Sequence, residues 1–322
     1  MLIWLTLKNL SQKEKEEVIE ALYKTNYGWL FVCFLLSVLS NISRAIRWKM
    51  LITPLNHQPK LSNTFFALMI GYLANYAFPR LGEVTRCGIL SKYEKIPFNV
   101  SFGTVIAERA IDLITLMLIF LITFLWQFER ISTYTHQKIL SPIALKLNSL
   151  WQDKTTSAIL FILLIIGLSA LVFFLKKRQK SPIFLKIKSI IKGFWEGLSA
   201  IKKLKNPVAF IFHSTFIWSM YFLMNYVGFN ALQQTAHLGM DAGLAVLVFG
   251  SIGMIAVQGG IGAFPVLVME TLGLYNISPS IGFAFGWVAW SMQTFSILTM
   301  GFLSLLLLPF LNKKNPSQKG VK

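Results

Sequence analysis

Long apolar runs are the feature that most constrains what this chain can fold into. Seven of them occupy residues 27–42, 65–79, 100–126, 158–175, 207–232, 242–274 and 281–311. A helix crosses the hydrocarbon core of a bilayer with about 20 apolar residues. Only 14% of the 322 residues are charged, against about 25% in a soluble domain, so charges are too few to cover a soluble core. The pattern excludes a soluble enzyme or a disordered chain and predicts an all-α, polytopic helical membrane protein.

Two of these runs are interrupted at corresponding places in the two halves of the chain. Run 65–79 carries Gly71 and is followed by a turn sequence, and run 242–274 is broken near its middle by glycines. Short apolar segments interrupted by Gly or Pro point to a transporter's midplane site, because a broken helix frees backbone groups that lipid cannot satisfy. We therefore expect about six to eight spans, one or two re-entrant or broken helices, and an internal repeat. Simple packing of helices through small residues is the alternative.

The distribution of basic residues predicts the topology. The net charge is +18, but the excess falls in loops between apolar runs, so we expect no nucleic-acid partner. Residues 176–206 form a basic loop, which predicts that this loop and both termini are cytoplasmic and that residues 44–60 lie outside. We expect an amphipathic surface helix at 1–26, one transmembrane domain at 27–311 and a basic tail at 312–322, in the inner (cytoplasmic) membrane.

Three charged residues lie deep inside the third run. Glu108 and Asp112 are four residues apart and share one helix face, whereas Arg109 lies about 100° away. Charges at this depth are costly and usually face a cavity or a partner. We expect the three to form an intramembrane polar relay, although a structural ion pair between helices is an equal alternative.

The first half also supplies the candidate anion-binding residues. Guanidinium groups suit phosphate oxygens, and the candidates for a lipid phosphate or headgroup are Arg44, Arg47, Arg80 and Arg86. They could also balance the net charge of −1 on the relay. Residues 206–312 contain no Lys or Arg, so this half can offer an anion only backbone N–H groups at its glycine break. The residues expected to line a cavity at the two breaks are Asn75, Pro79, Gly82, Glu83, Gly259, Gly260 and Gly262.

Enzyme signatures are missing from the sequence. It contains no nucleophile elbow, no H-E-x-x-H zinc motif, no Walker A loop and no Cys/His metal cluster. We therefore predict no enzyme activity, no catalytic residue, no metal and no cofactor.

Taken together, four motifs in order resemble a known family. They are Arg44-x-x-Arg47-Trp48, the stretch from Ile70 to Arg86, Glu108-Arg109-x-x-Asp112, and Gly259-Gly260-Ile261-Gly262. The combination resembles the flippase-like transmembrane region of lysylphosphatidylglycerol synthases over about residues 27–311. The resemblance implies a polytopic domain that moves a lipid between leaflets. No aminoacyl-transferase domain accompanies it, so we expect no lipid lysylation.

The resulting hypothesis is a membrane transporter that moves an anionic, aminoacylated or polyprenyl-linked lipid between leaflets. Its partner would be a membrane phospholipid or a lipid-linked substrate. Two alternatives stay open: a membrane-embedded enzyme that modifies lipids, and a non-transporting partner of an envelope-synthesis complex. The sequence also leaves open a homo-oligomer or an association with an envelope enzyme.

Overall fold

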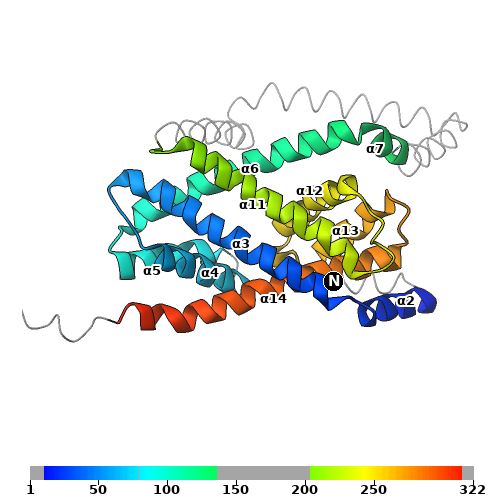
Figure 1. Cartoon of the computed structure of the whole chain (residues 1–322), viewed down its shortest axis with the longest axis horizontal. Helices are drawn as coiled ribbons and strands as arrows, with labels where there is room; N and C mark the ends of the chain where they lie inside the picture. Colours follow the sequence, from blue (N-terminus) through cyan, green and yellow to red (C-terminus); the bar gives the residue numbers. More distant parts are fainter. Residues whose placement is uncertain (1–10, 79, 136–203, 314–322) are drawn as a thin grey trace, which may run out of the picture. The chain divides into compact units, whose positions relative to one another are not determined.

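The computed structural model describes residues 11–78, 80–135 and 204–313, and these residues form helices and connecting turns without a strand (Figure 1). Three helical stretches in this part are long and apolar enough to cross a membrane, Tyr27–Leu55, Pro207–Ala231 and Pro279–Leu311. The predicted all-α membrane fold is therefore confirmed. The predicted span at 158–175, Pro79, and most of the basic loop 176–206 and of the tail 312–322 lie outside the described residues.

The chain divides into two compact units. One comprises residues 1–123 and 197–322, and the other comprises residues 124–196. Of the second unit, the structure describes only the end of one long helix and the short helix α7 (Phe128–Thr135). All features discussed below belong to the first unit.

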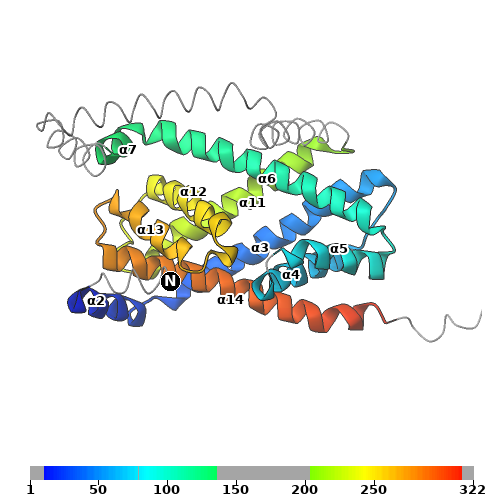
Figure 2. The same ribbon diagram turned by 180° about the vertical axis from the view of Figure 1, so that it is seen from behind.

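The first unit is built from nine α-helices in its described part, with short 3-10 turns after α3, α11 and α12. In chain order they are α2 (Gln12–Tyr23), α3 (Tyr27–Ile52), α4 (Leu61–Ala77), α5 (Leu81–Glu94), α6 (Phe98–Trp126, whose last residues enter the second unit), α11 (Pro207–Gly228), α12 (Met240–Ala256), α13 (Ala263–Gly273) and α14 (Pro279–Leu311). Helix α14 packs against α2, α3, α4 and α13, and Figure 2 shows it running past α2 and α4.

Polar caps fix where several helices begin. The side-chain oxygens of Asn26 and Asn206 accept the first free backbone N–H groups of α3 and α11, and Ser278 does the same for α14. Proline follows directly at the first position of α11 and of α14. A proline is favourable there because its missing N–H has no intrahelical acceptor in any case.

Helix α3 is longer than its apolar run predicts. The helix continues to Ile52, so Arg44 and Arg47 lie within it, 4% and 0% exposed. The helix therefore extends ten residues past the apolar run 27–42, and residues 44–52, which the charge distribution places outside, are part of it. The reason is that carboxylates on another helix neutralise both arginines, so these charges do not end the buried helix.

Helix α2 lies within the predicted surface helix 1–26, and part of its apolar face contacts protein. Val18 and Ala21 are buried in a hydrophobic cluster with residues of α12, α13 and α14. The hydroxyl of Ser280, at the start of α14, donates to the Glu17 carboxylate over 2.6 Å. Ile19, by contrast, is 54% exposed. The helix is therefore attached to the bundle along one side.

The first interrupted segment folds as the helical hairpin α4–α5. The backbone N–H of Gly82 donates to Oδ1 of Asn75 over 2.7 Å and closes the turn. Gly82 faces Gly71 so closely that a Cβ at position 82 would collide with the Gly71 carbonyl oxygen. Glycine is required at this contact because the two backbones meet without room for a side chain.

The second interrupted segment folds as the hairpin α12–α13. Helix α12 ends at Ala256 and α13 begins at Ala263, and between them Gly259, Gly260 and Gly262 adopt φ values of +66°, +69° and +75°. Glycine reaches this left-handed region without the steric penalty of other residues. The glycine pattern therefore predicts this break correctly.

Candidate functional site

Glu108 of α6 is the centre of a buried ionic cluster. Its Oε2 lies 3.0 Å from Nη1 of Arg86 on α5, and its Oε1 lies 3.2 Å from Nη1 of Arg44 on α3. Nη2 of Arg47 is 3.5 Å from the same Oε1. The Glu108 side chain is fully buried. One carboxylate therefore joins three helices in a place from which water is excluded.

Asp112 extends the cluster by one helical turn. Its Oδ2 lies 2.9 Å from Nη1 of Arg44, and its Oδ1 lies 2.6 Å from Nη2 of Arg47. Since Glu108 and Asp112 are four residues apart, they present both carboxylates on one face of α6. Arg44 and Arg47 lie on consecutive turns of α3, so the two helices are joined by two layers of charge-assisted hydrogen bonds.

Arg86 is held from its other side by an aromatic ring. Its guanidinium carbon lies 4.7 Å from the centroid of the Trp48 ring. The indole Nε1 of Trp48 donates to the hydroxyl of Thr104 over 3.0 Å. This contact is favourable, because cations are attracted to the ring face. Trp48 is therefore part of the cluster.

Arg109 points away from this cluster. Its Nη2 lies 3.0 Å from Oε1 of Glu83, in the first turn of α5. The Arg109 side chain is 44% exposed and that of Glu83 is 25% exposed. Glu108, Arg109 and Asp112 thus divide into a buried cluster on one face of α6 and a more accessible ion pair on another. The predicted single relay has two separate parts.

The charges of these groups do not cancel. Four arginines (44, 47, 86 and 109) face three carboxylates (83, 108 and 112), which leaves one formal positive charge. Several buried guanidinium nitrogens, among them Nε of Arg44 and Nη2 of Arg86, have no hydrogen-bond partner within the described structure. The cluster and the neighbouring ion pair thus carry a surplus of positive charge.

A cavity of about 350 Å³ adjoins both helix breaks, and we call it the break cavity. Arg44, Arg109 and Glu83 line one part of it, and Asn75 and Gly259 bring the two breaks to its wall. The remaining polar lining comes from Tyr72, Tyr76, Tyr221, Asn41, Ser37 and Gln293. The break cavity is thus a partly polar space beside the ionic cluster.

Hydrogen bonds hold the second break against this cavity. Nε1 of Trp290 donates to the Gly259 carbonyl oxygen over 2.7 Å. The hydroxyls of Tyr76 and Thr294 are 3.1 Å apart, which links α4 to α14 beside the same break. The carbonyl freed by the interruption of α12 is therefore satisfied by α14 rather than by lipid.

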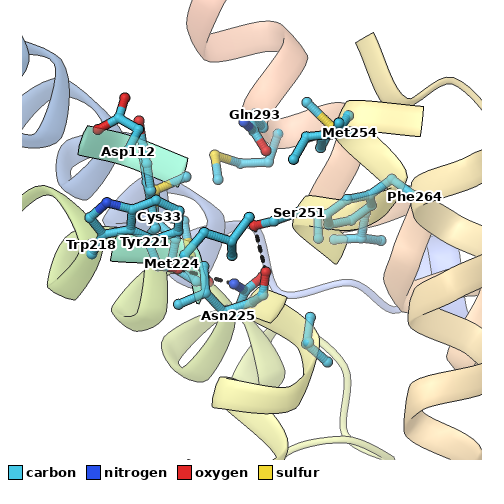
Figure 3. Close-up of a pocket in the computed structure, with 18 of the residues that line it drawn as sticks. Cys33, Asp112, Trp218, Tyr221, Met224, Asn225, Ser251, Met254, Phe264 and Gln293 are labelled. Carbon is cyan, nitrogen blue, oxygen red and sulfur yellow. Dashed lines mark hydrogen bonds between the residues drawn. The ribbon is translucent and has the colours of Figure 1, made fainter. Parts of the chain in front are cut away.

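A second space of about 330 Å³, the central cavity, continues from the same arginines into apolar surroundings (Figure 3). It shares Arg44, Arg109, Tyr221 and Gln293 with the break cavity. Asp112 lies at its charged part, and Figure 3 shows Asn225 and Ser251 facing it from α11 and α12. Its remaining lining is largely Met, Leu, Val and Phe. The central cavity is therefore amphipathic.

The structure assembles some of the predicted site residues and separates others. Arg44, Arg47 and Arg86 meet around Glu108 and Asp112, but Arg80 is exposed at the start of α5 and makes none of these ion pairs. Gly82, Gly260 and Gly262 shape the two turns without lining the break cavity. Within the described residues, no three potential metal-ligating side chains come together.

Sequence reasoning missed the polar residues that other helices contribute to the cavities. Tyr72 and Tyr76 repeat every four residues on α4, next to the first break, and this spacing could have identified them. Tyr221 and Gln293 are isolated in apolar runs. No local pattern distinguishes them from ordinary membrane-helix residues.

Comparison with known proteins agrees with this architecture. A family model described as the lysylphosphatidylglycerol synthase TM region matches residues 1–301. A UPF0104 membrane protein of Methanocaldococcus jannaschii is 32% identical over 100 residues, a stretch that covers 30% of this chain and 30% of that protein. No solved structure matches the chain. On the extent of the family match, this chain belongs to the lysylphosphatidylglycerol synthase transmembrane-region family.

Proposed function

We propose that this protein moves a lipid with a phosphate-bearing headgroup between the leaflets of the cytoplasmic membrane. The lipid would be anionic, aminoacylated or polyprenyl-linked. The observation that carries the proposal is the break cavity, a polar space that borders two broken helices and has arginine side chains on its wall. A lipid headgroup crossing a bilayer needs such a polar environment, because the hydrocarbon core offers no hydrogen-bonding partners.

Arg44 and Arg109 are the residues proposed to contact the phosphate. Both line the break cavity and the central cavity, and the ionic groups around them carry one surplus positive charge. Planar guanidinium groups bind phosphate oxygens through paired hydrogen bonds. Arg47 and Arg86 would act at a distance, by fixing the carboxylates that orient Arg44. The basic loop 176–206 supports a cytoplasmic location for that loop and for both termini.

A reconstitution assay tests this proposal. The purified protein would be placed in liposomes that carry trace phosphatidylglycerol labelled with a fluorophore on one acyl chain, and back-extraction with albumin would report its arrival in the outer leaflet. We expect Arg109→Ala to slow this movement by about tenfold or more, equivalent to the loss of one charge-assisted contact. Lys92→Ala is the control, because Lys92 is a cation on the outer side of α5 that lines neither cavity.

Each outcome separates the proposal from its alternatives. Unchanged movement in Arg109→Ala and Arg44→Ala would refute the headgroup site. A chemically altered lipid recovered from the liposomes would replace transport by enzymatic modification. If wild-type protein moves no lipid but co-purifies with an envelope-synthesis enzyme, the function is that of a partner protein.

A further inference from the structure

An apolar groove of about 840 Å³ lies between α3 and α14, and the end of α2 contributes to its lining. Phe31 and Phe34 line it from α3, and Trp287 and Phe295 line it from α14. The rings of Phe34 and Phe295 have centroids 6.3 Å apart and join the two walls. None of the residues that line the groove is charged, and only three of them carry an aliphatic hydroxyl.

The groove adjoins the central cavity. Leu30 of α3 and Val288 and Met292 of α14 line both spaces. The central cavity in turn reaches Arg44 and Arg109. The apolar groove and the cavity that contains the arginines thus share a wall made of three apolar side chains. A single amphipathic molecule can therefore occupy both spaces.

The dimensions of the groove match one hydrocarbon chain. It follows α14 from Trp287 to Thr299, which at about 1.5 Å per residue is about 18 Å. Half of the hydrocarbon core of a bilayer is about 15 Å thick. Both walls belong to helices that are long and apolar enough to cross the membrane, so a lipid chain is the apolar molecule that a membrane would offer to the groove.

We propose that the α3–α14 groove binds a hydrocarbon chain of the same lipid whose phosphate group lies at Arg44 and Arg109. The inference rests on the function proposed above and adds the place where the lipid chain is held. A chain in the groove stays in contact with the bilayer while the headgroup enters the central cavity past Leu30, Val288 and Met292. The ligand class is therefore a phosphate-bearing lipid with at least one chain long enough to fill about 18 Å.

Photochemical labelling tests where the chain lies. Phosphatidylglycerol with a diazirine in one acyl chain would be added in trace amounts to nanodiscs of phosphatidylcholine that contain the full chain. We expect labelling of groove residues such as Phe31 and Phe295 to exceed labelling of Leu303 and Leu306 by about tenfold, and unlabelled phosphatidylglycerol to compete it away. Leu303 and Leu306 are exposed on the same helix α14 but do not line the groove. Equal labelling of both sets, without competition, would overturn the proposal.

A substitution that fills the groove provides the second test. Ser291 is exposed and lines the groove, so Ser291→Trp should occupy the space of the chain without disturbing the buried core. We expect it to reduce groove labelling and lipid movement by about tenfold while the thermal unfolding temperature stays that of wild type. Leu306→Trp is the matched control and should change neither quantity. If Ser291→Trp folds normally and both quantities stay at the wild-type value, the groove does not hold the chain.

The two proposals fail in different ways. Suppose that the groove is labelled, that unlabelled lipid competes with the label, and that the protein moves no lipid. This result would refute transport and leave the lipid site in place. Suppose instead that lipid movement depends on the arginines but is unchanged in Ser291→Trp, and that the labelling is unspecific. This result would refute the groove site and leave transport in place.

Discussion

Nη1 of Arg86 lies 3.0 Å from Oε2 of Glu108, with the two side chains 2% and 0% exposed. A buried pair of this kind costs desolvation free energy that its mutual attraction only partly offsets, but removing one partner leaves an uncompensated charge. Glu108 meets three arginines, so its loss would leave Asp112 as the remaining carboxylate of the cluster. Removing one member of the cluster is therefore expected to destabilise the bundle.

Glu108→Gln should lower the free energy of unfolding by about 3–5 kcal/mol. The amide keeps the shape of the side chain but removes its charge, so Arg86 would lose its countercharge in a buried site, and Arg44 and Arg47 would keep only Asp112. Thermal unfolding in mild detergent, followed by circular dichroism, measures the effect. Glu83→Gln is the control, because its carboxylate also pairs with an arginine but is 25% exposed. Equal losses in the two variants would contradict a special role for the buried cluster.

The ion pair between Arg109 and Glu83 should contribute little to stability. Its side chains are 44% and 25% exposed, and accessible ion pairs contribute about 1 kcal/mol or less. The exchanged variant Arg109→Glu/Glu83→Arg should keep the pair and unfold like wild type. Lipid movement should nevertheless stay low, because the cation has left the position proposed to contact phosphate. Recovery of wild-type movement in the exchanged variant would make this pair a structural link only.

Gly82→Ala should destabilise the hairpin α4–α5 by about 1–3 kcal/mol, the typical cost of overpacking. The new methyl group would meet the Gly71 carbonyl oxygen and the side-chain amide of Asn75. Gly88→Ala, on the same helix, places a methyl group where no atom lies within 4 Å. It should stabilise α5 slightly, since alanine favours helix over glycine. Thermal unfolding of both variants measures the contrast, and similar unfolding temperatures would refute the close backbone contact.

The sequence predicts the helices and the breaks well because both follow from local properties. Apolar runs of membrane-spanning length require helices, and glycines that adopt positive φ mark the break at Gly259 and Gly260. The sequence indicates Arg44, Arg47 and Arg86 through their guanidinium groups and their places in the motifs. Which carboxylate each one contacts depends on how α3, α5 and α6 cross, and no local pattern encodes that crossing.

The same limit explains where the prediction of the site fails. Arg80 has the same charge and nearly the same sequence neighbourhood as Arg86, yet one is exposed at the start of α5 and the other is buried over Trp48. Arg80 precedes the first helical residue of α5 and has a left-handed backbone, whereas Arg86, six residues later, lies inside the helix on its buried side. The end of α3 was misplaced for a related reason, because the neutralising carboxylates of Glu108 and Asp112 lie more than 60 residues away in sequence.

The capping box formed by Ser11 and Glu14 predicts that the first turn of α2 becomes less ordered at low pH. The backbone N–H and the hydroxyl of Ser11 donate to the Glu14 carboxylate, and these hydrogen bonds lower the pKa of Glu14 below its usual 4.5. A lowered pKa means that the contribution is complete at neutral pH and is lost as the pH falls through the folded-state pKa. A nitroxide label at Lys15→Cys should therefore be ordered at pH 7 and become mobile in acid. When Ser11→Ala is added to the labelled Lys15→Cys protein, the helix loses its cap. The label should then be more mobile at pH 7 than in Lys15→Cys alone, and its mobility should change less with pH. A label equally ordered in both variants at pH 7 would mean that contacts with α14, through Val18 and Ala21, hold α2 without its cap.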